Sequence, residues 1–196
     1  MTILVTYKTE DKIYMGCDTQ VTGGVTEFCK DKWHKVMIND NDYVMIGCTG
    51  YAKFGDFFRH GFKPPHYYKE NDFVDYLHNQ LAPAITKALT KRKITKEKDG
   101  NLQTESEFVV VYDEVYTLIE DAAPYQQSEV FMATGSGYRL AYGAYYATCA
   151  NNIKSAVYLD DDKAIKGMIG DCIDAAKCYD PYCGGEQVIH VMERAK

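Results

Sequence analysis

The chain has 196 residues, of which 46% are hydrophobic and 26% charged, a composition that suits one globular domain and excludes a disordered chain. Its formal net charge of −6 argues against a nucleic-acid binder that works through a broadly basic surface. The sequence carries no apolar run of membrane-spanning length and no signal peptide, so we expect a cytoplasmic protein without a membrane partner.

The first half of the chain is predicted to begin with short strands and to continue with two helices. Strands are predicted near residues 2–8, 12–17, 34–38 and 43–47. Helices are predicted over 49–60 and from about residue 71 into the eighties, with Pro83 expected to kink the second. The strongly charged stretch 87–105 is expected to be a solvated helix end and loop, with a docking surface for a partner as the alternative.

The second half repeats this grouping of strands followed by helices. A hairpin is predicted within 107–120, around Asp113-Glu114, and a strand that runs into a glycine turn within 129–138. Helices follow over 139–151 and 163–179, and a strand closes the chain at 186–193. Acidic residues suited to capping precede the second helix, and one face of it is predicted to be lined by Ile165, Met168, Ile169, Cys172, Ile173 and Ala176. Helices grouped in pairs between strand runs predict helix layers outside antiparallel sheets, an α+β arrangement in one domain over residues 1–196.

The seven cysteines are scattered along the chain, odd in number and without a CxxC pair. This pattern favours reduced thiols in a cytosol-like compartment over a disulfide framework. The spacing gives no zinc signature, so we expect no metal.

The N-terminus runs straight from Met1-Thr2 into the strand-forming stretch "ILVTY". An initiator methionine can be trimmed when the next residue is small, and its removal would leave Thr2 with both a hydroxyl and a free α-amine. An α-amine has an unperturbed pKa of about 7.7–8.0, so it can act as the base for that hydroxyl. Many proteins begin Met-Thr, however, and an edge strand that starts early explains this stretch equally well.

Five further residues stand in short motifs that could complete a catalytic site. Asp18 ends the second predicted strand in "MGCDTQVTGG", and Lys35 opens the third in "DKWHKVMI". Gly50 lies where a strand gives way to a helix, Ser136 stands between two glycines, and Asp180 opens "DPYCGG". Taken singly, each has an ordinary explanation as a turn cap, a surface charge or a tight bend. Their joint order and spacing is the specific signal.

In this order the motifs resemble the β-type proteasome subunit family, and within it the bacterial HslV peptidases. Mature chains of that family begin with a threonine and an apolar strand, followed by an aspartate motif, a lysine before a hydrophobic strand, a GSG turn and a D-x-x-S-G-G-like segment. "DTQVT" is close to the HslV form, whereas "GSGYRLAYG" and "DPYCGG" are nearer the general proteasome pattern. The resemblance runs from Thr2 to about Val191 and is weakest over 60–110. It implies an α+β fold, the four-layer αββα sandwich of N-terminal-nucleophile hydrolases.

The resemblance also implies catalytic roles for the matching residues. Thr2 is the nucleophile, and its α-amine accepts the hydroxyl proton. Lys35 stabilises the developing alkoxide as a cation, with Asp18 as its counter-charge. The Gly50 N–H is the donor of the oxyanion hole.

Supporting and substrate-binding roles follow in the same way. Ser136 and Asp180 orient the α-amine, and the Thr22 backbone holds the substrate as an added strand. Cys48, beside the oxyanion glycine, is expected to shape a specificity pocket. Cys183 departs from the family, which usually has serine there. Because a thiol is a weak hydrogen-bond partner, the support around Thr2 is expected to be weaker or to come from water.

The function implied by the resemblance is a threonine-type endopeptidase that cleaves peptides or unfolded proteins through an acyl-enzyme, without a metal or organic cofactor. It implies a homo-oligomeric, proteasome-like or HslV-like ring, with a ring ATPase as the expected partner. Two alternatives stay open: an amidase of the same fold acting on a small molecule, and a catalytically silent ring or scaffold subunit that retains Met1.

Overall fold

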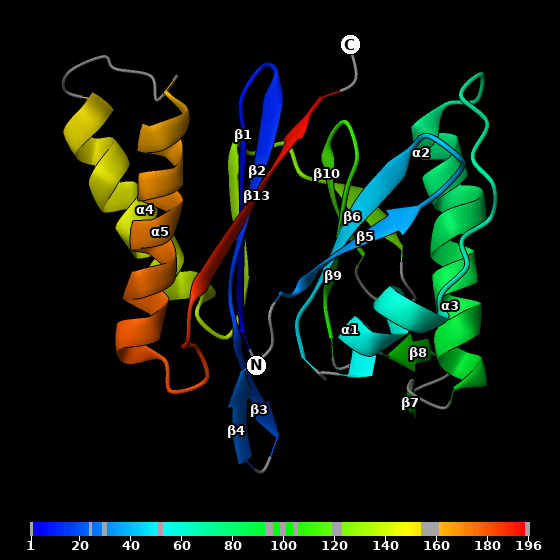
Figure 1. The fold of residues 1–196 in the computed structure, drawn as a ribbon, viewed down its shortest axis with the longest axis horizontal. Coiled ribbons are helices and arrows are strands. Elements are labelled where there is room, and N and C mark those ends of the chain that lie inside the picture. Colours follow the sequence, from blue (N-terminus) through cyan, green and yellow to red (C-terminus); the bar gives the residue numbers. More distant parts are fainter. Residues whose placement is uncertain are drawn as a thin grey trace. The chain divides into compact units, whose positions relative to one another are not determined.

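The computed structural model describes residues 2–23, 25–28, 31–50, 53–92, 96–98, 101–103, 106–118, 123–153 and 161–194. The chain divides into two compact units, one built from Met1–Lys32 with Ser128–Lys196 and the other from Trp33–Gln127. Each unit contains an antiparallel sheet and helices, which Figure 1 colours along the chain. The single domain expected over residues 1–196 stays a prediction.

The first unit contains a four-stranded antiparallel sheet with the first two strands at its centre. Its strands are, in order, β12 (Phe131–Gly135), β1 (Ile3–Lys8), β2 (Lys12–Asp18) and β13 (Gln187–Glu193). Leu4 lies opposite both Cys17 and Thr134, so β1 is a central strand and the edge-strand explanation of the N-terminus is wrong. The strands predicted near 2–8, 12–17 and 186–193 are confirmed.

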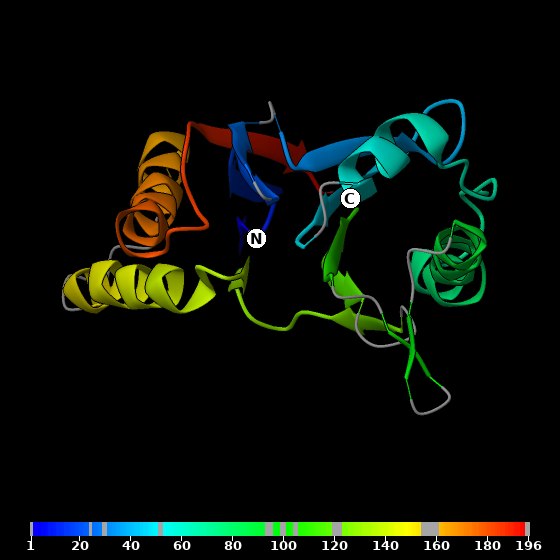
Figure 2. The same ribbon diagram turned by 90° about the horizontal axis from the view of Figure 1, so that it is seen from below.

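Helices α4 (Tyr138–Ile153) and α5 (Asp162–Tyr179) cover one face of that sheet, as Figure 2 shows. The predicted acidic cap is confirmed, because Asp161 accepts the N–H of Ala164 at 3.0 Å. The predicted apolar face of α5 is buried and comprises Ile165, Met168, Ile169, Cys172, Ile173 and Ala176. Gly16 on β2 permits this close packing, since a Cβ there would lie 2.5 Å from Ile169 Cγ2. Helix α5 therefore packs directly on the strands that carry Thr2 and Asp18.

The second unit contains a five-stranded antiparallel sheet and the remaining helices. Its strands are, in order, β11 (Pro124–Gln126), β10 (Val115–Leu118), β9 (Phe108–Val111), β6 (Tyr43–Cys48) and β5 (Trp33–Met37). Its helices are α1 (Lys53–Asp56), α2 (Phe73–Tyr76) and α3 (Ala82–Lys91), with π-helical turns η1 (Phe57–Gly61) and η2 (Leu77–Leu81). The core joins strand side chains such as Ile46 and Val110 to Phe54, Leu77 and Ile85.

The long helical stretch of this unit passes Pro83 without ending there. Because proline lacks an N–H, it cannot continue the ordinary hydrogen-bond ladder. The wider turn η2 precedes it, and the Ala82 N–H bonds the Leu77 carbonyl five residues back. The helix then continues to Lys91.

Three short pairings were not predicted from the sequence. β7 (Lys96–Lys98) pairs with β8 (Asn101–Gln103) inside the stretch expected to be a loop, so that expectation is wrong there. β3 (Gln20–Gly23) pairs with β4 (Val25–Phe28), and β11 extends the hairpin of β9 and β10. These strands are only three or four residues long, too short to show the apolar alternation that marks longer strands.

The expectations about membrane-spanning segments and about cysteines can be compared with the residues that the structure describes. Within the residues that the structure describes, no helix is long and apolar enough to cross a membrane. The six cysteines in these residues are all free thiols: Cys17, Cys48, Cys149, Cys172, Cys178 and Cys183.

Candidate active site

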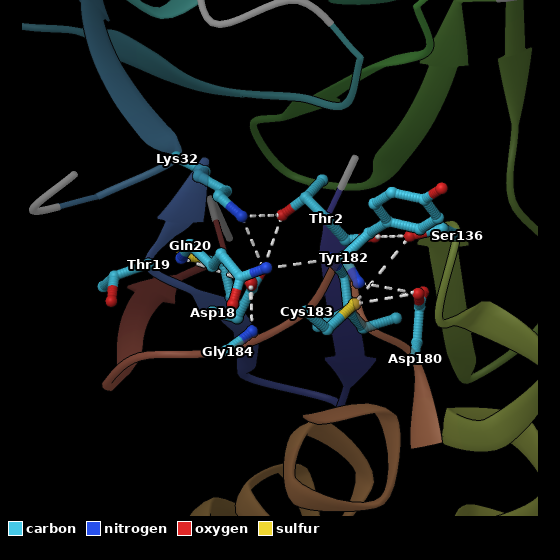
Figure 3. Close-up of polar contacts among 12 residues, drawn as sticks. Thr2, Asp18, Thr19, Gln20, Lys32, Ser136, Asp180, Tyr182, Cys183 and Gly184 are labelled. Atoms are coloured by element: carbon cyan, nitrogen blue, oxygen red, sulfur yellow. Dashed lines mark hydrogen bonds and ion pairs between the residues drawn. The ribbon is translucent and has the colours of Figure 1, made fainter. Parts of the chain in front are cut away.

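Thr2 lies at the head of β1, where its side chain meets a buried ion pair (Figure 3). Its hydroxyl donates to Asp18 Oδ1 at 2.5 Å, and Lys32 Nζ donates to the same hydroxyl oxygen. Lys32 Nζ also lies 2.6 Å from Asp18 Oδ1. Antiparallel pairing of β1 with β2 produces this meeting, because it sets the start of one strand beside the end of the other. The three residues are nearly inaccessible, with exposures of 2% (Thr2), 0% (Asp18) and 6% (Lys32).

The lysine at this site is Lys32, and the prediction of Lys35 is wrong. Lys35 is an exposed residue of β5, and its ammonium lies 3.9 Å from the centre of the Tyr43 ring. Strand pairing explains that contact: Lys35 lies opposite Met45, so Tyr43 is its diagonal neighbour on the adjacent strand. The sequence did contain the signal. The family pattern places its lysine before a hydrophobic strand, and β5 begins at Trp33, one residue earlier than predicted.

Asp18 is satisfied at both carboxylate oxygens. Besides Thr2 and Lys32, Oδ1 accepts the Ile3 N–H at 3.0 Å. Oδ2 accepts the main-chain N–H groups of Gln20 at 3.3 Å and Gly184 at 3.0 Å. A fully buried carboxylate needs such partners, since an unpaired buried charge is strongly destabilising. No motif in the sequence indicates Gln20 and Gly184 as partners of Asp18.

The structure brings three further predicted residues of this unit together near the Thr2 backbone. Ser136 Oγ donates to the Thr2 carbonyl at 3.5 Å and lies 3.9 Å from Cys183 Sγ. Cys183 donates to Asp180 Oδ2 at 3.4 Å. Burial raises the pKa of Cys183 to about 12, and the nearby charges of Asp18 and Asp180 add to the effect. Cys183 is therefore a neutral thiol at physiological pH and acts as a hydrogen-bond donor.

The two glycines that flank Ser136 are required by close contacts at this site. Gly135 has a φ of +99°, and a Cβ there would lie 2.1 Å from the Thr2 carbonyl oxygen. A Cβ on Gly137 would lie 2.6 Å from the Cβ of Ala176 and 3.0 Å from Cys183 Sγ. The GSG turn thus lets β12 approach Thr2 and α5 at the same time.

Three predicted residues lie outside this cluster of contacts. Gly50 follows β6 in the second unit with a φ of 89°, and Cys48 is the buried last residue of that strand. Thr22 lies in β3 opposite Thr26 of β4. Their roles stay predictions. Within the described ranges, no group of three or more histidine, cysteine, aspartate or glutamate side chains could hold a metal ion.

An ion pair anchors the residue next to Lys32. Asp31 Oδ2 lies 2.5 Å from His190 Nε2 on β13, and Asp31 Oδ1 accepts Cys17 Sγ–H at 3.6 Å. The hydrogen bond to Asp31 raises the pKa of His190, against the opposing effect of burial. Burial and the Asp31 charge hold the pKa of Cys17 well above its usual range. The segment that carries Lys32 is therefore fastened to β2 and β13.

This pair predicts a pH-dependent stability. A histidine whose pKa is raised by folding stabilises the protein fully below its unfolded pKa of about 6.5, and this contribution is lost as pH rises through the folded value. The free energy of unfolding of the unmodified protein is expected to fall by at most about 1 kcal/mol as the pH rises above about 6.5, since the pair is partly exposed. His190→Gln is expected to abolish this fall. Urea unfolding across pH 6–9 measures it, with the exposed His78→Gln as control. Curves for the parent protein and His190→Gln that stay parallel with pH would contradict the prediction.

Comparison with known proteins identifies the fold that contains this site. No protein-family model matches the sequence, and no curated protein sequence matches it. BPH of Thiobacillus denitrificans in complex with epoxomicin matches at a TM-score of 0.66 and 17% identity, over 99% of this chain and 100% of that chain. Another BPH structure matches at 0.68 and 18%, over 98% of both chains. HslV from Trypanosoma brucei matches at 0.60 and 17%, over 98% of this chain and 99% of that one.

The chain has the HslV fold. The predicted fold class is thereby confirmed: an α+β fold, the four-layer αββα sandwich of the N-terminal-nucleophile hydrolase type. The likeness covers almost the whole chain, including the stretch 60–110 where the sequence motifs are weakest. Within the HslV fold, Thr2, Asp18 and Lys32 form the buried polar centre described above.

Proposed function

We propose that this chain is a threonine-type endopeptidase that cleaves peptide bonds through an acyl-enzyme at Thr2. The observation that carries the proposal is the Thr2 hydroxyl, held between Lys32 and Asp18 at the head of a central strand in the HslV fold. Burying a lysine and an aspartate around one hydroxyl is costly for stability alone, so the arrangement favours a chemical role for that hydroxyl.

The reaction requires that Met1 be removed, because only then does Thr2 carry a free α-amine. The Thr2 Oγ attacks the carbonyl carbon of the substrate, and its proton passes to the α-amine directly or through a water. The C–N bond then breaks, the leaving amine takes up that proton, and the acyl group remains as an ester on Thr2. Water, deprotonated by the same α-amine, hydrolyses the ester and regenerates the hydroxyl.

Lys32 supplies the electrostatic part of this mechanism. Its ammonium contacts Thr2 Oγ and therefore favours the negative charge that develops on that oxygen during attack. Asp18 balances the cation and, through its hydrogen bond with the Ile3 N–H at 3.0 Å, fixes it relative to β1. No metal or organic cofactor is needed for this chemistry.

The remaining assignments place supporting groups around the reacting atoms. We assign the oxyanion hole to the Gly50 N–H and the orientation of the α-amine to Ser136 and Asp180, with Cys183 linking those two side chains. We assign substrate binding to the main chain at Thr22 in β3, along which the peptide adds as an extended strand. Cys48 contributes to the pocket that selects the substrate side chain.

The assembly and cellular context belong to the same proposal. The full-length likeness to HslV supports a ring of identical subunits that degrades peptides or unfolded proteins. A ring ATPase that delivers the substrate and a cytoplasmic location complete it. Sedimentation of the purified protein measures the assembly state, and a monomer with full activity would refute the ring.

Two measurements on the same material test the proposed activity: peptide turnover and the intact mass of the protein. A panel of fluorogenic peptides should be cleaved, and intact mass spectrometry of the active material should show the loss of one methionine. Full activity with Met1 attached would refute the threonine mechanism. Cleavage of small-molecule amides but not peptides would identify the amidase alternative, and inactivity with Met1 retained would identify the silent subunit.

A further inference from the structure

Gln20 joins the end of β2 to the turn 181–184, which follows Asp180. Gln20 is only 8% exposed, and its Nε2 donates to the carbonyl of Pro181 at 2.8 Å. Its main-chain N–H is shared between Asp18 Oδ2 at 3.3 Å and the Gly184 carbonyl at 3.0 Å. One residue thus holds both ends of the turn 181–184, and it does so beside Asp18 (Figure 3).

Gly184 makes this contact possible because it lacks a side chain. A Cβ at this position would lie 2.1 Å from Gln20 Oε1 and 3.2 Å from Gln20 Cδ. Gly184 is not among the positive-φ glycines of the described residues, so it is needed here for space and not for backbone conformation. Its N–H donates to Asp18 Oδ2 at 3.0 Å. The same glycine therefore accommodates Gln20 and binds the carboxylate.

Asp18 divides its oxygens between the Thr2 hydroxyl and this turn. Oδ1 contacts Thr2 and Lys32, whereas Oδ2 accepts the N–H groups of Gln20 and Gly184. A carboxylate is planar, so fixing Oδ2 fixes the direction in which Oδ1 points. Any movement of the turn would rotate Asp18 and displace the ammonium that it holds against Thr2.

We propose that Gln20 is a positioning residue whose carboxamide, packed on Gly184 and bonded to Pro181, sets the orientation of the Asp18 carboxylate. Its effect on catalysis rests on the proposed peptidase function, whereas the contact itself does not. A glutamine that only filled space would change the stability of the fold when removed. A positioning glutamine changes kcat as well, because small displacements of reacting groups carry large rate costs.

A double-mutant cycle tests the coupling between the two residues. Gln20→Ala and Gly184→Ala are each expected to lower kcat about tenfold while KM stays within about twofold. The double variant is expected to match Gln20→Ala, since removing the glutamine removes the atoms that the Gly184→Ala methyl group would meet. A Gly184→Ala loss that is equally large without Gln20 would overturn the proposal.

A second glycine–glutamine contact in the same unit provides the matched control. Gln187 Nε2 donates to the Gly170 carbonyl at 3.0 Å, and a Cβ on Gly170 would lie 2.9 Å from Gln187 Oε1. Gly170 belongs to α5 and has no contact with Asp18 Oδ2 among those described. Gly170→Ala is expected to change the urea midpoint and leave kcat within about twofold. A fall in kcat equal to that of Gly184→Ala would show that the cycle reports packing alone.

Hydrogen exchange of the segment 181–186 provides a readout independent of activity. Gln20→Ala and Gly184→Ala should each accelerate exchange there, and the double variant should add nothing further. Unchanged exchange in both single variants would disprove the contact, and faster exchange with an unchanged kcat would leave Gln20 a structural residue and refute its positioning role. An unmodified protein that cleaves no peptide would instead refute the proposed function, and the exchange data would still decide whether the contact exists.

Discussion

Lys32→Ala is expected to lower kcat for peptide cleavage by about 10³-fold or more. The reason is the position of its ammonium, which contacts the Thr2 hydroxyl oxygen and lies 2.6 Å from Asp18 Oδ1. Without it, the negative charge that forms on Thr2 Oγ lies beside the carboxylate of Asp18 with no cation between them. Initial rates with a fluorogenic peptide measure the effect, and near-normal hydrolysis would place the site elsewhere.

Lys35→Ala is the matched control for this experiment. The two lysines are three residues apart, but Lys35 is exposed and its ammonium lies over the Tyr43 ring. An exposed contact of this kind contributes only about 0.5–1 kcal/mol to stability. We therefore expect Lys35→Ala to retain turnover within about twofold. Loss of turnover in Lys35→Ala but not in Lys32→Ala would restore the original prediction from the sequence.

A folding defect must be separated from a catalytic one. Removing one partner of a buried ion pair costs about 3–5 kcal/mol of stability, although the main-chain donors to Asp18 reduce that cost here. Lys32→Arg keeps the positive charge but replaces a compact ammonium by a larger, planar group. Lys32→Arg is expected to fold but to be inactive. Activity equal to that of the unmodified protein would mean that a positive charge alone suffices.

The strands and helices that are long and strongly patterned could be predicted from the sequence. The β-branched run after Thr2 predicted β1, and the spacing from Ile165 to Ala176 predicted the buried face of α5. The sequence could not show that β1 is central in its sheet, because that depends on β12, which comes about 130 residues later. The short hairpin of β7 and β8 was also missed, since its charged sequence carries no apolar alternation.

The candidate site was predictable where a residue type is itself the signal. Thr2, Asp18, Ser136, Asp180 and Cys183 stand in motifs, and the structure brings them together. The lysine could not be identified in this way. Three lysines stand near the start of β5, and the sequence does not show at which residue that strand begins. The contacts of Gln20 with Pro181 and Gly184 could not be predicted at all, since they join residues about 160 positions apart.

Thr2→Ala is expected to abolish peptide cleavage, and Thr2→Ser is expected to retain part of it. Alanine and serine are both small, so Met1 can be removed from either variant and processing does not confound the comparison. Serine keeps the hydroxyl and the α-amine but lacks the methyl group that restricts threonine to fewer rotamers, so its oxygen is less well held between Lys32 and Asp18. Normal hydrolysis by Thr2→Ala would refute the nucleophile assignment.

The reacting atom can also be found directly, because the chain offers competing thiols. A peptide epoxyketone such as epoxomicin, the compound bound to BPH, should add its mass to the N-terminal peptide that begins at Thr2. Cys17 and Cys48 are buried, and burial holds the pKa of Cys17 well above its usual range, so it is a poor nucleophile. Cys17→Ser and Cys48→Ser should therefore retain most of the turnover and bind the inhibitor at the same peptide. An adduct that maps to either cysteine would overturn the threonine mechanism, whereas an adduct at Thr2 that is lost in Lys32→Ala would join both predictions in one experiment.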